Sequence, residues 1–184
     1  MKKSIKHTIV STLVCALCSI VAPNSSAAQT PTDVAMSGIR DEWKVMIANI
    51  TAAAEELTDA EYAYKPTAKV RSFGELIGHV AGTQNMICAA VLGDKQPAED
   101  AIEKSAKTKV ALVAALKAST AYCAKAYAIS AGAMTAQVDM FGEKSTKIAA
   151  LILNAVHDGE HYGNIVTYMR MQGKIPPSSK PAKK

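Results

Sequence analysis

The chain has 184 residues, with 21 Lys+Arg, 16 Asp+Glu and a formal charge of +5. Seven of the basic residues lie in the first six or last eleven positions; removing them leaves 14 bases against 16 acids in residues 33–173, a net charge of −2. A nucleic-acid-binding domain carries a basic face within its fold, so this distribution excludes a nucleic-acid partner. An apolar content of 49% with 20% charged residues excludes a disordered chain.

Residues 1–28 are typical of a cleaved secretory signal peptide. They combine a basic start of three lysines, an apolar run over 9–22, and Ser26-Ala27-Ala28 as a cleavage site. The apolar run is too short to span a bilayer. A lipoprotein signal has a small residue before its cysteine, whereas Val14 and Leu17 precede the two cysteines here. We therefore expect an exported protein, periplasmic or secreted, with no membrane span after cleavage.

Export leaves two cysteines, Cys88 and Cys123, in an oxidising space. A disulfide between them is allowed there. The alternative is that both are small buried apolar side chains on helices. The sequence favours this alternative, because geometry decides whether a disulfide forms and the sequence does not show it.

Four long proline-free stretches with helical periodicity follow in chain order. In the second, Ser72 and Glu75 form a capping-box pattern and Gly93 ends the helix. In the fourth, Ser145 is the expected cap. The predicted helices are residues 34–57, 72–92, from after Pro97 to about 131, and 145–172. The predicted inner face of the third consists of Ile102, Ala106, Val110, Val113, Leu116, Thr120, Cys123 and Tyr127.

Four amphipathic helices with one apolar stripe each predict an all-α fold, a four-helix bundle. The connections 58–71 and 134–144 are long and permit crossovers, whereas 93–97 is short. Three apolar residues of the second long connection are expected to pack on the bundle: Val138, Met140 and Phe141. The domains are residues 1–28, the signal peptide; 29–173, the bundle; and 174–184, a flexible tail rich in Pro, Ser and Lys.

Three histidines remain after the leader is removed: His79, His157 and His161. The last two are four residues apart, so they project about 40° apart on one helix face and can reach one ion. An imidazole from a facing helix would complete a three-ligand site with open coordination positions. The alternative is three ordinary half-buried histidines, because this spacing also arises by chance.

The helix face that carries His157 and His161 also carries Asn154, Asn164 and Tyr168. Polar groups inside a bundle are costly unless paired or bound, which indicates a cavity. These three residues, together with Thr83, are candidates for substrate contacts. Residues 157–161 also read as the peptidase motif H-x-x-E-H, but the chain offers no further carboxylate or imidazole ligand in its last eleven residues, so this match indicates a coincidence.

The sequence resembles the DinB-like four-helix metalloproteins in three segments. Residues 72–80, SFGELIGHV, are similar to the start of the family's second helix with its single His ligand. Residues 157–164, HDGEHYGN, and the following YMR resemble its H-x-x-x-H-R-G-Q segment and Y-L-R, and GKIPP at 173–177 resembles its closing G-x-x-P-P. Tyr162 and Asn164 stand where the family usually has Arg and Gln. The resemblance implies a bundle with long crossover connections, a metal site at the three histidines, and a homodimer.

Two functions follow as expectations. The first is a metal-dependent enzyme, a hydrolase or a thiol-dependent transferase, that binds a divalent ion (Zn, Ni, Fe or Mn) and a small-molecule substrate. The second is a non-catalytic periplasmic bundle that binds a metal or ligand. An open coordination position permits catalysis without proving it. An ion beneath a solvent-accessible cleft would favour the enzyme, and a closed apolar roof would favour the binding protein.

Overall fold

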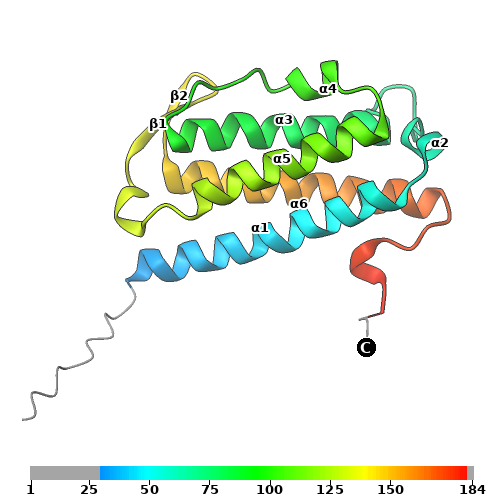
Figure 1. The fold of residues 1–184 in the computed structure, drawn as a ribbon. Coiled ribbons are helices and arrows are strands. Elements are labelled where there is room, and N and C mark those ends of the chain that lie inside the picture. Colours follow the sequence, from blue (N-terminus) through cyan, green and yellow to red (C-terminus); the bar gives the residue numbers. More distant parts are fainter. Residues whose placement is uncertain (1–29, 182–184) are drawn as a thin grey trace, which may run out of the picture.

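The computed structural model describes residues 30–181, so the predicted signal peptide lies outside the described residues. These residues are mostly helical, which confirms the all-α prediction apart from one short hairpin. The long helices are α1 (Pro31–Glu56), α3 (Phe73–Leu92), α5 (Lys109–Tyr127) and α6 (Lys147–Met171) (Figure 1). The short elements are α2 (Asp59–Tyr62), α4 (Ala101–Ser105), β1 (Gln137–Met140), β2 (Glu143–Thr146), and the 3-10 turns Ala131–Ala133 and Pro177–Ser179.

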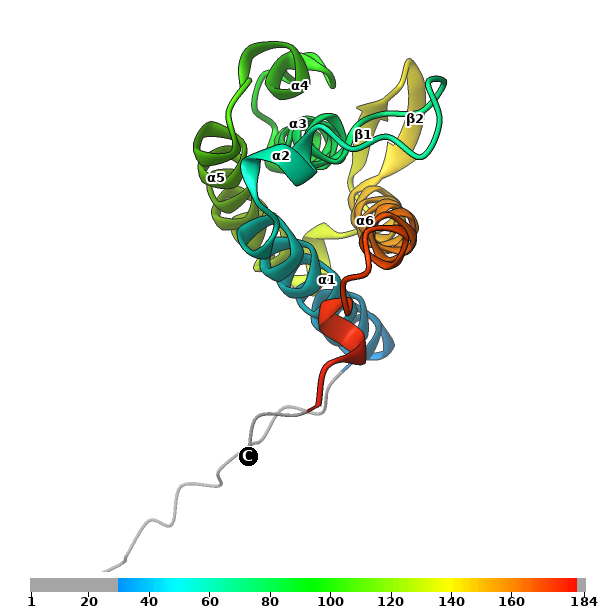
Figure 2. The ribbon, with the colours of Figure 1, turned by 90° about the vertical axis from the view of Figure 1, so that its right-hand side faces the viewer.

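The four long helices pack side by side around one core. Viewed end-on, α1 and α3 occupy opposite corners, and α5 and α6 lie between them on either side (Figure 2). The helices α3 and α5 run in the same direction, so residues 93–108 must return along the length of α3 (Figure 1). The predicted short connection at 93–97 is therefore wrong. Parallel neighbours require a long crossover.

The third predicted helix is divided into α4 and α5. Ala106 adopts an extended backbone (φ −86°, ψ 112°), and the Thr108 hydroxyl then accepts a hydrogen bond from the Ala111 amide, 3.2 Å, as the cap of a new helix. This restart changes the predicted inner face: Val110 is 79% exposed, and Leu112 is buried in its place. The sequence did not predict this break, because the apolar periodicity continues through it and a threonine such as Thr108 is also compatible with a helix interior.

The connection before α6 is an antiparallel hairpin, which the sequence did not predict. Val138 pairs with Ser145, and the turn lies at Phe141 and Gly142, whose positive φ angles of 53° and 84° match the twist of a tight hairpin. Val138 and Met140 are buried as expected, but Phe141 is exposed at the tip. The fourth helix is capped by Thr146 rather than Ser145, since the Thr146 hydroxyl accepts a hydrogen bond from the Ala149 amide, 3.3 Å.

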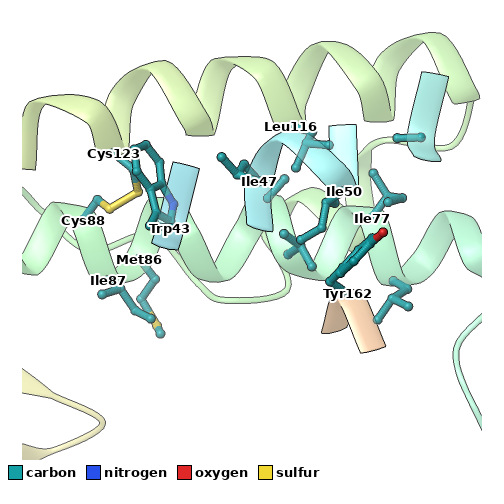
Figure 3. Close-up of a cluster of buried hydrophobic side chains, with 14 of the residues drawn as sticks. Trp43, Ile47, Ile50, Ile77, Met86, Ile87, Cys88, Leu116, Cys123 and Tyr162 are labelled. Carbon is teal, nitrogen blue, oxygen red and sulfur yellow. A yellow bond between two sulfur atoms is a disulfide. The ribbon is translucent and has the colours of Figure 1, made fainter. Parts of the chain in front are cut away.

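The core combines aliphatic side chains from all four long helices with a few aromatic rings. Trp43 of α1 stacks on Tyr127 of α5 with ring centroids 4.3 Å apart. Beside Trp43, Cys88 and Cys123 form a disulfide between α3 and α5 (Figure 3). The favoured prediction of two separate buried thiols is therefore wrong. The parallel course of α3 and α5, which no local pattern reveals, is what brings the two cysteines together.

The segment after α6 contacts the helices that precede it. Lys174 forms an ion pair with Glu61, 2.9 Å, and Lys180 forms one with Glu56, 2.6 Å. The Ser178 amide donates a hydrogen bond to the hydroxyl of Tyr162, 2.9 Å. The composition that predicted a flexible tail did not indicate these contacts. Within the described range, no helix is both long and apolar enough to cross a membrane.

Candidate metal centre

The first histidine is carried by α3, near the end of the molecule where that helix begins. The Ser72 hydroxyl accepts from the Glu75 amide, 3.2 Å, and the Glu75 carboxylate accepts from the Ser72 amide, 2.7 Å. This capping box fixes the start of the helix, as the sequence predicted. His79 follows two turns later and is 6% exposed.

The other two histidines lie one turn apart on α6. Nε2 of His157 is 3.1 Å from Nε2 of His79 and 3.0 Å from Nε2 of His161. All three rings thus direct the same nitrogen to one point, and the cluster could hold a metal ion. A divalent ion about 2.0–2.1 Å from two imidazole nitrogens sets them about 2.9 Å apart at a right angle and about 3.4 Å apart at the tetrahedral angle. The observed separations lie between these limits.

The burial of the rings favours their neutral, ligand-ready form. Burial, together with the charges of Arg71 and His157, lowers the pKa of His79 to about 4. Burial, reinforced by the other two histidines and by Arg71, lowers the pKa of His161 to about 3. A metal binds imidazole only in the unprotonated form. At neutral pH these two rings therefore need to lose no proton before they can bind an ion.

The opposite nitrogen of each ring, Nδ1, faces a polar side chain. Nδ1 of His157 lies 3.8 Å from the carboxylate of Asp158, and both are buried without a hydrogen bond in the described chain. Burial raises the pKa of Asp158 to about 6. Nδ1 of His161 lies 3.4 Å from the side-chain amide nitrogen of Asn164, which is a hydrogen-bond donor. With Nε2 engaged by an ion, Nδ1 of His157 carries the proton and faces the Asp158 carboxylate, and such outer acceptors orient the rings of metal-binding histidines.

For His79 these acceptors come from the crossover. Its Nδ1 is 3.6 Å from Glu99 and 3.9 Å from Glu103, and it has no closer partner among residues 30–181. The Thr83 hydroxyl, one turn further along α3, donates to Glu99, 3.3 Å. Arg71 donates from Nε to both oxygens of Glu103, 3.0 and 3.2 Å. The crossover thus supplies two carboxylates to a ring that α3 holds.

Two glycines on α3 explain how the crossover comes so close. A Cβ at Gly78 would lie 2.8 Å from Cα of Glu103, and one at Gly82 would overlap the carbonyl oxygen of Glu99. Close approach of backbones is the usual reason to keep glycine inside a helix despite its entropic cost. The pair Gly78 and Gly82, one turn apart, is therefore the sequence signal for the crossover contact.

A cavity of about 710 Å³ opens beside the histidine cluster, with His161 on its wall. Of the predicted substrate contacts, Asn164 and Tyr168 line this cavity. Thr83 does not line it and is bonded to Glu99 instead. Asn154 is fully buried elsewhere and donates to the Tyr127 hydroxyl, 3.2 Å.

Sequence reasoning missed the charged residues around the cavity. Glu103 and Arg71 line it, and both belong to connections rather than to the helices with the histidines. Glu160, the carboxylate of the apparent peptidase motif, is exposed. Its position agrees with the interpretation of that motif as a coincidence.

The fold and the cluster define a class: mostly helical proteins in which two helices bring three imidazoles together beside an open cavity. A family model, the DinB superfamily, matches residues 42–165. Since the match covers more than half of the chain, the protein belongs to the DinB superfamily.

Solved structures agree with this assignment at the level of the fold. A DinB-like protein from Bacillus cereus has a TM-score of 0.66 at 14% identity, over 77% of this chain and 95% of that one. A conserved protein from Enterococcus faecalis has a TM-score of 0.62 at 17% identity, over 80% and 100% of the two chains. A DinB-like protein from Bacillus subtilis has a TM-score of 0.53 at 20% identity, over 79% and 99%. No curated protein matches the sequence.

Proposed function

We propose that the protein is a metal-dependent enzyme that acts on a small molecule, with His79, His157 and His161 as the ligands of one divalent ion. The observation that carries this proposal is that His161 belongs both to the cluster and to the wall of the open cavity. A substrate in the cavity therefore reaches the edge of the ion site. Structural zinc sites usually have four protein ligands, whereas catalytic sites have three and an open position.

A bound divalent ion supplies a Lewis acid that polarises a carbonyl or phosphoryl group. The chain itself supplies a carboxylate, Glu103, which lines the cavity and lies 3.9 Å from Nδ1 of His79. We assign to it the acceptance of a proton from an attacking nucleophile, because it lines the cavity that a substrate would enter. Asn164 and Tyr168 also line the cavity, and we assign to them the orientation of the substrate. This arrangement supports hydrolysis.

The proposal includes export to the periplasm or the medium, on the basis of the leader at residues 1–28. It also includes a four-helix bundle of the DinB-like kind, which we expect to form a homodimer. Export favours hydrolysis over thiol-dependent transfer, because the thiol pools of the cytosol are not available there. Imidazole ligands do not distinguish zinc, nickel, iron and manganese.

The test is a screen of esters, amides and thiol conjugates with metal-depleted protein, to which each of these metals is restored in turn. We expect turnover that requires a metal, is lost in His161→Ala, and falls in Glu103→Gln without loss of bound metal. Glu160→Gln is the matched control, since this exposed carboxylate neighbours His161 in sequence but points away from the site. Stoichiometric metal binding without turnover of any substrate class would instead indicate the non-catalytic binding protein.

A further inference from the structure

The connection between α2 and α3 forms one wall of the cavity and carries its positive charge. Lys65, Lys69 and Arg71 line the cavity from this connection, facing α6 across it. The connection is held in place at its end, since the Phe73 amide donates to the carbonyl of Tyr64, 3.0 Å, and the Tyr168 hydroxyl of α6 donates to the carbonyl of Arg71, 2.9 Å. The three cations are therefore attached to a fixed segment of backbone.

The acidic residues of the cavity do not cancel this charge. Lys65 pairs with Glu75, 2.8 Å, and Arg71 pairs with Glu103 through Nε alone, so its two terminal nitrogens keep their hydrogen-bonding capacity. Lys69 forms no ion pair within residues 30–181, and its side chain is exposed to the cavity. Three cations against two carboxylates leave a net charge of +1 on these lining side chains.

A cavity with net positive charge and unused Arg and Lys donors recognises an anion. Guanidinium and ammonium groups bind carboxylate and phosphate oxygens through short charge-assisted hydrogen bonds. The body of the protein is acidic overall, at −2 over residues 33–173, so the positive charge is a local property of this cavity. The remaining wall offers the ring of Tyr168, which meets Tyr64 edge to face at 6.2 Å, as an apolar surface.

We infer that the cavity binds a small molecule with a carboxylate or phosphate group, held by Lys69 and Arg71, with an apolar part against Tyr168. The molecule lies between the basic connection and His161, both of which line the cavity. Only the identification of this molecule as the substrate rests on the proposed function. The binding of an anion does not.

The test measures binding in metal-free protein, so that neither a metal nor turnover contributes. Benzoate and phenyl phosphate are the anionic probes, and benzamide is the neutral probe of matched shape. Binding is followed by amide chemical shifts in a protein labelled with nitrogen-15. We expect both anions to shift the amides of Lys69, Arg71 and Thr167, and benzamide to bind at least about fivefold more weakly, since one charged hydrogen-bond pair contributes at least that factor.

Two variants remove or keep the charge. Lys65→Gln/Lys69→Gln, which removes two of the three cations that line the cavity, should weaken phenyl phosphate binding by about tenfold. Lys69→Arg, which keeps the charge, should bind phenyl phosphate like the parent protein. Lys125→Gln, on the exposed face of α5 away from the cavity, is the control for net charge and should leave binding unchanged. Chemical shifts of the core amides report whether each variant is folded.

The inference is overturned if benzamide and benzoate bind equally, if the double lysine variant binds like the control, or if anions bind only when a metal is present. These outcomes are separable from failure of the proposed function. Anion binding without metal-dependent turnover contradicts only the enzyme, and turnover confined to neutral substrates contradicts only the identification of the bound anion as the substrate.

Discussion

Replacement of Gly82 by alanine should destabilise the protein by displacing the crossover from α3. Alanine in place of glycine in an exposed helix normally stabilises by about 0.5–1 kcal/mol. At Gly82 the new Cβ would overlap the carbonyl oxygen of Glu99, which is a backbone atom and cannot rotate away. Overpacking of this kind costs about 1–3 kcal/mol. The substitution should therefore lower the free energy of unfolding, against the normal trend.

The matched control is Gly38→Ala in α1, where a Cβ would meet nothing within 4 Å. The gain in helix propensity at Gly38 and the overpacking at Gly82 together predict that the free energies of unfolding of the two variants differ by about 1.5–4 kcal/mol. Gly74→Ala should fall between them, since its Cβ would meet the Tyr62 ring at 3.1 Å, and a side chain can move. Urea unfolding monitored by circular dichroism, with the disulfide intact, measures all three. If Gly82→Ala and Gly38→Ala are equally stable, the crossover does not pack on the glycines of α3.

Two further predictions concern the disulfide and the pH dependence. Replacing Cys88 and Cys123 together by alanine should lower the free energy of unfolding by about 3–4 kcal/mol, as expected for a closed loop with a sequence separation of 35. Urea unfolding of the oxidised parent and of the variant measures this difference. Equal stabilities would mean that the disulfide contributes nothing to the stability of the folded state. The metal-free protein should lose stability as the pH falls from about 6.5 to about 4, because the pKa values of His79 and His161, about 4 and about 3, lie below those of the unfolded chain, so that unfolding takes up protons. The raised pKa of Asp158, about 6, offsets part of this loss. Urea unfolding in EDTA measures the effect, and a urea midpoint that stays constant or rises as the pH falls over this range would contradict the burial of these two rings.

The helices and the histidine cluster could be predicted because their signals are local. The capping box at Ser72 and the glycine at 93 set the limits of α3 to the residue, and the spacing of His157 and His161 follows from the helical period. That His79 faces the other two followed from the family resemblance and from the expectation of a bundle. It did not follow from the spacing of any single segment.

The features that the sequence did not reveal depend on contacts between distant segments. Glu99 and Glu103 reach His79 only because α3 and α5 are parallel and the crossover returns along the glycines. The same parallel course joins Cys88 to Cys123. The hairpin escaped prediction because its strands have four residues each, and its turn places Phe141 at positive φ, a conformation that a bulky residue rarely adopts.

The measurement that tests the central claim most directly is the metal content of the purified protein and of its His157→Ala variant, by elemental analysis after dialysis against trace zinc. His157 is the variant of choice because its Nε2 lies next to both other Nε2 atoms. Glu160→Gln serves as the control. We predict about one ion per chain in the parent and the control, and a loss of most of that metal in His157→Ala. Equal metal content in all three proteins would contradict a metal site at these histidines.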